Sequence, residues 1–394
     1  MGGINIVRAK GQLGRTTPTE DAVVCMVFSG TAVATKIALS EPKQIFSSDA
    51  LEDLGMTEGN NPVAYRDIMD FYGKAGEGAE LNFMLVSDAT NLTDICNVTN
   101  DIAKKLITFT QDRGVILLVN RKPAAGYTAT ITNGMDNDVW NAITKLNEMA
   151  VQYQTKNAPF VGILPALYFD TTKISEIPLR STLTTDNVAL STACEKADGH
   201  ISMGALAGWL VRHQVSENFS RIASGPIFNT GFFPDMVPSL NLKNAWSAIN
   251  NKAFMYLYKE PGKQGYFFND DSTMTTVSSD YSSISWNRTI NKVHRIAYTT
   301  LVEKLRDDVD INPVTGKVET SLLSDWESDV ENDIIANMVN TGVTKKPEIS
   351  GVKCIIDPNS DILNDKLDVT IQIVRRGQVK TFNVKIGYVR KIEE

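Results

Sequence analysis

The first half of the chain alternates between two hydrophobic patterns. Continuous apolar runs of strand length lie at residues 22–28, 81–86, 115–119 and 160–164. Such runs are typical of strands that are covered on both faces. Between them, apolar residues recur at helical spacing over residues 92–109 and 140–153. Strands and helices in this order imply right-handed crossovers, so we predict an α/β domain with a layered, mostly parallel sheet and flanking helices.

The pattern changes after a run rich in Gly and Pro that ends at Pro238, and this run predicts a domain boundary near residue 230. Beyond it, aromatic runs at 253–258 and 265–268 flank a Pro-Gly turn and predict a hairpin. We therefore expect an N-terminal extended arm and linker, the α/β domain, and an α+β C-terminal domain, over residues 1–20, 21–230 and 231–394.

Two amphipathic helices are predicted in the C-terminal domain, over residues 288–306 and 324–340. The first helix has basic residues on the surface beside its apolar stripe, at Arg288, Lys292 and Arg295. The second begins with a capping-box pattern and carries acidic residues in its first half, at Asp325, Glu327, Asp329 and Glu331. Acidic residues suit the positive end of a helix dipole. A basic helix beside an acidic one is also consistent with a pair of docking faces for a charged partner.

Apolar and polar residues alternate near the end of the chain, over residues 367–373 and 382–388, with Gly377 between the two runs. This pattern predicts a β-hairpin. A lone hairpin is marginal in water and leaves two open edges, so it needs a sheet elsewhere in the chain or in another subunit. Near the start of the chain, Ile4 and Ile6 lie on one face of a short predicted strand, which a polar linker follows.

Composition and charge exclude several classes of protein. The chain has 394 residues, of which 42% are hydrophobic, enough for two or three domains with real cores. Its formal net charge of -7 argues against a dedicated nucleic-acid binder. The first residues lack a secretory signal, and no stretch is long enough to span a bilayer. We expect a soluble protein that remains in the cytoplasm, without direct membrane insertion.

Motifs for catalysis or cofactor binding do not stand out. The glycines before the predicted strand at 81–86 match neither GxGxxG nor a P-loop. No carboxylate or second histidine lies at ligand spacing on a shared helix face with any of His200, His213 and His294. The single, scattered cysteines predict buried free thiols, at Cys25, Cys96, Cys194 and Cys354. We expect no metal, no cofactor and no enzymatic activity.

The C-terminal domain has a recognisable order of features. These are residues 264–269, the approach at 281–288 with Arg295, the acidic helix with Trp326, Pro358 with 361–365, and the closing runs at 367–374 and 382–389. In order and spacing they resemble contractile tail sheath proteins, a family that includes the sheaths of contractile-tailed phages, R-type pyocins and related injection systems. The resemblance covers residues 231–394 well and extends more loosely over the α/β half.

The resemblance implies a structural subunit that polymerises as stacked hexameric rings around an inner tube and contracts to drive the tube through a target envelope. In such sheaths both chain ends add strands to sheets of neighbouring subunits. The positions that match these arms are Ile4, Ile6, Phe382, Val384, Ile386 and Tyr388. A helix of the C-terminal domain grips the tube, and both the basic and the acidic helix are candidates.

The implied partners are further copies of the chain, an inner tube protein, and baseplate and terminal cap proteins. Assembly would take place in the bacterial cytoplasm, before the protein becomes part of a phage tail or contractile particle. Two other hypotheses remain open. The chain could be another tail or baseplate structural protein, or an α/β enzyme whose site has no recognisable motif.

Overall fold

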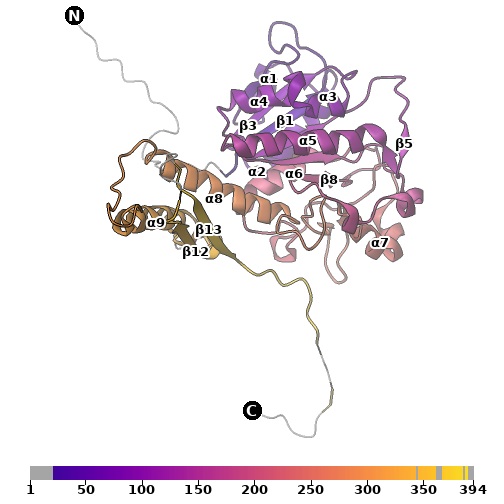
Figure 1. Cartoon of the computed structure of the whole chain (residues 1–394). Helices are drawn as coiled ribbons and strands as arrows, with labels where there is room; N and C mark the ends of the chain where they lie inside the picture. The colour runs from indigo at the N-terminus through magenta and orange to yellow at the C-terminus, as the bar shows by residue number, and fades with distance from the viewer. Residues whose placement is uncertain (1–20, 343–344, 361–365, 385–386, 389–394) are drawn as a thin grey trace, which may run out of the picture.

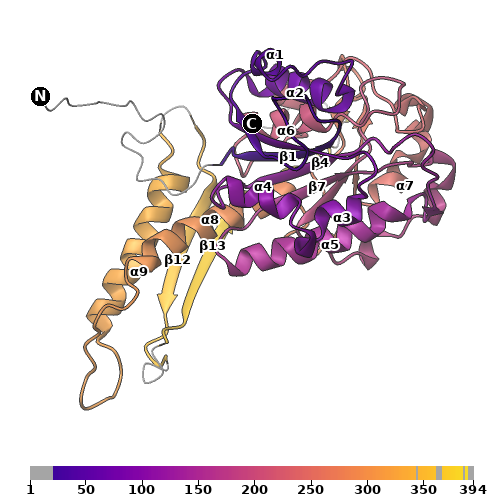
Figure 2. The same cartoon turned by 90° about the horizontal axis from the view of Figure 1, so that it is seen from above.

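The computed structural model describes residues 21–342, 345–360, 366–384 and 387–388. It has a large α/β part, which we call the body (residues 21–283), and a narrower part that extends away from it (Figure 1). A long helix, α8 (Ile284–Val302), connects the two. The narrower part, which we call the projecting unit, consists of α9 (Thr320–Ile334), β12 (Ile349–Ile356) and β13 (Val369–Arg375) (Figure 2).

The described residues of the body form a seven-stranded sheet with the order β2-β3-β1-β4-β7-β8-β9. The strands are Val24–Ser29 (β1), Lys43–Ile45 (β2), Leu81–Val86 (β3), Ile116–Asn120 (β4), Val161–Pro165 (β7), Val188–Ser191 (β8) and Phe254–Met255 (β9). Every pairing is parallel except that of β2 with β3. The prediction of a mostly parallel sheet is therefore confirmed. The four predicted strands correspond to β1, β3, β4 and β7.

Helices cover both faces of this sheet (Figure 2). One face carries α2 (Pro62–Ala75) and α6 (Met203–Arg212), and the other carries α3 (Leu92–Cys96), α4 (Ala103–Phe109) and α5 (Asn137–Thr155). The helix predicted over 92–109 is broken between α3 and α4. The side chain of Asn97 accepts a hydrogen bond from the Thr99 N–H, and Asp101 has the left-handed φ of 54°, which ends a helix.

Short elements complete the body. They are α1 (Ala50–Asp53), α7 (Trp246–Asn250), β5 (Ile131–Thr132), β6 (Met135–Asp136), β10 (Leu257–Tyr258), β11 (Phe267–Phe268), and the 3-10 turns η1 (Val98–Asn100), η2 (Thr171–Glu176), η3 (Arg180–Thr182), η4 (Ile222–Ser224) and η5 (Ser239–Ala245). The antiparallel pair β10–β11 confirms the predicted aromatic hairpin.

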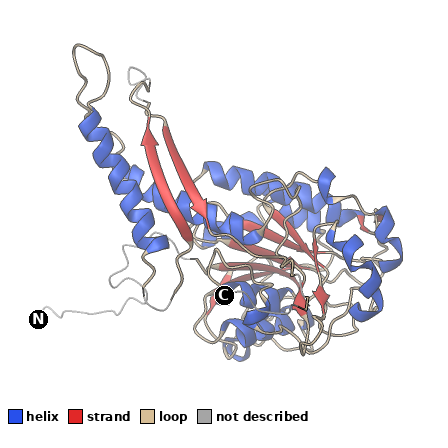
Figure 3. Cartoon of the chain, turned by 90° about the horizontal axis from the view of Figure 1, so that it is seen from below, coloured by secondary structure: helices blue, strands red, loops and turns tan. Residues whose placement is uncertain are grey.

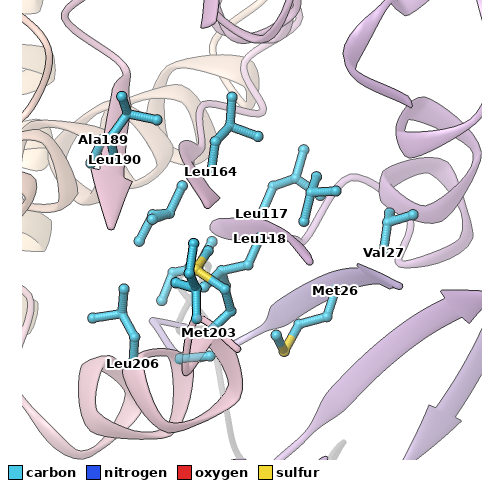
Figure 4. Packing of buried hydrophobic residues seen from close by; sticks show 14 of the residues in the cluster. Met26, Val27, Leu117, Leu118, Leu164, Ala189, Leu190, Met203 and Leu206 are labelled. Atoms are coloured by element: carbon cyan, nitrogen blue, oxygen red, sulfur yellow. The ribbon is translucent and has the colours of Figure 1, made fainter. Parts of the chain in front are cut away.

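The core of the body is one continuous cluster between the sheet and its helices. Leu164 of β7 and Leu190 of β8 point to the face that α5 covers, whereas Met26 of β1 and Leu118 of β4 are register partners that pack near Met203 on the α6 face (Figure 4). All are fully buried. Helices α2 and α6 are in close contact on this face, because α6 has glycines where a side chain would meet the α2 backbone.

The boundary predicted near residue 230 falls inside this core. Phe233, Ile249 and Phe254 all belong to the same buried cluster as β1. Strand β9 pairs with β8 at the edge of the large sheet. The Gly- and Pro-containing run before residue 238 is therefore a loop of the body. The body continues to the start of α8.

The predicted terminal hairpin is wrong. Strand β13 pairs with β12 in an antiparallel two-stranded sheet, with Cys354 opposite Ile371, and residues 381–384 form no strand (Figure 3). The alternating residues of β12, which the sequence prediction overlooked, provide the partner face. Helix α9 starts at Thr320 with Glu319 as its N-cap, so the predicted capping box at Ser324 is also wrong. A π-helical turn, η6 (Ile335–Val339), follows α9.

Candidate inter-subunit surface

The two-stranded sheet of the projecting unit is covered on one face only. Val330, Ile334 and Met338 of α9 and η6 pack with Ile349 and Cys354 of β12, and α8 contributes to the same cluster. The prediction that the apolar stripe of the second helix is buried is therefore confirmed. The side chains on the other face of the sheet are exposed, at Lys353, Ile355, Thr370, Gln372 and Val374.

The two edges of this sheet differ. Helix α9 lies beside β12 (Figure 2), and Glu327 and Glu331 accept hydrogen bonds from the backbone N–H groups of Ile356 (2.7 Å) and Cys354 (2.8 Å). The outer edge of β13 has no partner strand among the described residues. An edge of this kind is a template on which another strand can pair.

The chain that follows β13 is anchored at its start and then exposed. The guanidinium of Arg375 lies 3.4 Å from the ring centroid of Trp286, and Lys380 forms an ion pair of 2.6 Å with Asp270. Beyond this point Phe382 and Val384 expose 81% and 72% of their surface, and Tyr388 is fully exposed. Figure 1 shows the segment leading away from the body. These alternate apolar side chains are therefore left in solvent in the single subunit.

The anchor lies on a groove of about 910 Å³ between this segment and the body. Burial raises the pKa of Asp270, but Lys380 and the amide of Asn218 outweigh that effect and hold the pKa below its ordinary value. The neighbouring Asp271 is fully buried, and burial together with the charge of Asp270 raises its pKa to about 6. Asp270 is therefore the member of this pair that receives Lys380 as a carboxylate.

Three positions of the predicted arms, Ile4, Ile6 and Ile386, lie outside the described residues. The acidic positions on α9 divide into two groups. Glu327 and Glu331 face β12, whereas Asp325 and Asp329 are exposed, and Asp329 forms an ion pair with Lys304 (2.7 Å). Asp325 and Asp329 are therefore the more exposed pair.

The basic residues of α8 were predicted to lie on its surface, and this is wrong. The Arg288 guanidinium is buried and donates hydrogen bonds to the carbonyls of Leu210 and Asp21. Arg295 donates to the carbonyls of Asp112, Gly114 and Pro159. Burial lowers the pKa of both groups. These residues hold α8 against the body and are not available to a partner.

Lys292 has a related internal role. Its ammonium lies 2.6 Å from a carboxylate oxygen of Asp21 and 2.7 Å from one of Glu348. Asp21 is the first described residue, and Glu348 directly precedes β12. One buried cation therefore joins the start of the body, the connecting helix and the base of the projecting unit.

The carboxyl ends of β4 and β7 form a second cavity, of about 440 Å³. Ligands often bind at this edge of parallel sheets. His200 lies 3.0 Å from the buried carboxylate of Asp67, which also accepts a hydrogen bond from Asn120 (2.6 Å). The sequence analysis missed this pair because its members are 133 residues apart. The arginines that line the cavity already have partners, since Arg66 contacts Asp198 and Arg121 contacts Asp138.

The remaining candidate features are the cysteines, metal-ligating side chains and membrane-spanning helices. The thiols predicted to be free and buried are so, at Cys25, Cys96, Cys194 and Cys354. Within the described ranges, His, Cys, Asp and Glu side chains form no group of three or more that could hold a metal ion. Among the described helices, none combines the length and the apolar character needed to cross a membrane.

The overall arrangement matches solved structures along almost the whole chain. A chain in the cryo-EM structure of the anti-feeding prophage (AFP) baseplate aligns with a TM-score of 0.62 at 11% identity, covering 98% of this chain and 99% of that one. The contracted AFP helical sheath aligns at 0.59 and 10% identity, with 98% and 99% covered. The contracted PVC sheath complex of an extracellular contractile injection system aligns at 0.60 and 12% identity, with 98% and 97% covered. The fold is that of contractile sheath proteins.

The sequence identifies the family. The N-terminal domain of DUF2586 matches residues 1–272, and the C-terminal domain of DUF2586 matches residues 280–393. This protein belongs to the DUF2586 family. The gap between the two matched domains falls at the end of the body, next to the start of α8. No curated protein matches the chain in sequence.

Proposed function

We propose that this protein is a structural subunit of a contractile tail sheath. Copies of it polymerise as stacked hexameric rings around an inner tube and contract to drive the tube through a target envelope. The sheath fold over 98% of the chain supports this proposal. The observation that carries it is the combination, in the described part of the chain, of a β13 edge without a partner strand and an exposed apolar segment, residues 382–384 with Tyr388, that forms no strand.

The segment and the edge are complementary. Residues 382–388 alternate apolar and polar side chains. This pattern suits an added strand, in which backbone hydrogen bonds give affinity and alternate side chains give specificity. In the polymer this segment adds to β13 of a neighbouring subunit. Ile4 and Ile6 extend the same connection from the other end of the chain. These strands stay paired while the bodies change their packing, so contraction is a switch between two arrangements of rigid subunits.

The tube-facing surface is the exposed side of α9. Asp325 and Asp329 lie there, the latter paired with Lys304, whereas Arg288 and Lys292 of α8 are buried. An inner tube with a basic outer surface would fit this side by charge. Further contacts, to baseplate and terminal cap proteins, are made at the two ends of the polymer.

Truncation after Thr381 tests the proposal. The shortened chain should remain a folded, monodisperse monomer, because residues 382–384 and 387–388, the described part of the removed segment, form no strand within the subunit. It should no longer form cylinders in negative-stain electron microscopy. Deletion of residues 2–10 should have the same effect. A chain that lacks only residues 389–394 is the matched control and should still polymerise. Cylinders formed by the chain truncated after Thr381 would contradict strand exchange through the C-terminal segment.

The match to a chain of an AFP baseplate structure supports a second candidate, a structural subunit of a baseplate. The same microscopy distinguishes the two. A sheath subunit gives long striated cylinders, whereas a baseplate subunit gives closed rings or discs of fixed size.

A further inference from the structure

Two glutamates of α9 are spaced to match the edge of β12. Glu327 and Glu331 are four residues apart on one helix face, which places them about 6 Å apart along the axis. Cys354 and Ile356 are two residues apart in a strand, or roughly 7 Å. Each carboxylate therefore reaches one of two successive outward N–H groups, at 2.8 and 2.7 Å.

The ladder shows that these N–H groups belong to the outer edge. In an antiparallel pair, alternate residues bond to the partner strand and the residues between them point outward. Asp357 donates its N–H to the Asp368 carbonyl on the β13 side. Ile356 precedes Asp357 by one residue and Cys354 precedes it by three. The backbone N–H groups of both residues therefore point away from β13. Without the glutamates, both donors would be free on an exposed edge.

We propose that Glu327 and Glu331 close the β12 edge against strand addition and so direct a neighbour's strand to β13. The closure rests on the contacts described above, and the direction of addition rests on the proposed sheath function. A carboxylate only accepts hydrogen bonds. It therefore satisfies the N–H groups of β12 and offers an incoming strand no donor in their place. The ammonium of Lys353 lies 2.8 Å from Glu331 and keeps that carboxylate on the strand. The occupant of the open edge is residues 382–388 of a second copy.

Hydrogen exchange of the full-length chain tests the closure without any polymer. Glu327→Ala with Glu331→Ala should speed exchange of the Cys354 and Ile356 amides about tenfold or more, because each amide loses a charged acceptor. The matched control, Asp325→Ala with Asp329→Ala, removes two charges from the same helix and should leave these rates unchanged. Glu327→Gln with Glu331→Gln keeps an acceptor oxygen and should give intermediate rates in a folded protein. Equal rates in the alanine pair and the unsubstituted chain would overturn the closure.

Disulfide cross-linking tests which edge of the sheet, β12 or β13, accepts the strand of a second copy. Val384→Cys in one copy should link to Thr370→Cys on β13 of another and not to Ile355→Cys on β12; both acceptor positions are exposed. Adding Glu327→Ala and Glu331→Ala should allow the second link. A link to residue 355 while both glutamates are present would overturn the proposal. If neither link forms, the proposed function fails, and the exchange measurement still decides whether the edge is closed.

Discussion

The body and the projecting unit are stabilised in different ways. Strands of the body, such as β1 and β4, are fully buried and covered by helices on both faces. Strands β12 and β13 are covered on one face, and one of their two edges is closed. A body of this kind is complete as a single subunit. In the projecting unit, the outer edge of β13 has no partner strand among the described residues.

The junction between the two regions is ionic. Arg288, Lys292 and Arg295 of α8 link backbone carbonyls and carboxylates across it. Such contacts need defined geometry, because a buried charge without its partner is costly. The junction therefore fixes the direction in which the projecting unit leaves the body.

Gly204→Ala should disrupt the body. A Cβ at this position of α6 would lie 1.9 Å from the Asp67 carbonyl oxygen, so α2 and α6 would have to separate. We expect a loss on the order of 4 kcal/mol in the free energy of unfolding, measured by urea denaturation. Gly73→Ala in α2 meets no atom within 4 Å and is the control; it should stabilise by roughly 0.5–1 kcal/mol. Equal unfolding midpoints for the two variants would show that the helices are not in close contact.

Lys292→Met should loosen the projecting unit more than the body. It leaves the carboxylates of Asp21 and Glu348 close together without their cation, which should cost about 3 kcal/mol. Adding Glu348→Gln removes one of these charges and should recover a large part of the loss. Hydrogen exchange resolved by segment measures the effect, and β12 should exchange faster while β1 stays protected. Equal loosening of β1 and β12 would mean that the two regions unfold together.

Lowering the pH should stabilise the body and destabilise the projecting unit. Burial and the charge of Asp67 raise the pKa of Asp70, in the body, to about 6 from its ordinary 3.8. Between these values the folded body holds a proton that the unfolded chain has lost. The body therefore gains stability as the pH falls from 7 through 6, by roughly 2–3 kcal/mol once the pH is below 3.8.

Glu331 of the projecting unit behaves in the opposite way, because Lys353 and the Cys354 N–H lower its pKa. Its contribution is present above its ordinary pKa and is lost as the pH falls through the lowered value. Urea denaturation between pH 4.5 and 7 measures the free energy of unfolding of the body. Asp70→Asn should flatten the pH dependence of this free energy. Glu52→Gln, at an exposed position of α1, should not. An unchanged slope in Asp70→Asn would contradict the assignment to Asp70.

The strands of the body could be predicted from the sequence because their burial leaves a direct trace. A strand covered on both faces is a continuous apolar run, so β1, β3, β4 and β7 were located closely. Strand β8 has only four residues and was missed, whereas β9 lies within the aromatic run predicted at 253–258 but its pairing with β8 was not predicted. A run that short carries too little pattern to separate it from a loop.

The strands of the projecting unit leave a weaker trace. Alternation in β13 predicted a strand with one buried face, but it does not specify which strand pairs with it. The correct partner, β12, was overlooked because Ser350, Gly351 and a register shift interrupt its alternation at the start. Val352, Cys354 and Ile356 were the signal that could have found it.

The site residues show a similar limit. Helical spacing placed Arg288, Lys292 and Arg295 beside the apolar stripe, but it could not show that carbonyls and carboxylates of distant elements enclose them. The partners of Glu327 and His200 were hidden for the same reason, since β12 and Asp67 approach them only in the folded chain.

The ion pair between Lys380 and Asp270 holds the start of the segment 381–388 against the body. The eight residues from 381 to 388 can reach at most about 28 Å from that point. Under the proposed strand exchange, the acceptor strand of an adjacent copy has to lie within this radius both before and after contraction. The length of this short segment would then limit how far two connected copies can move apart.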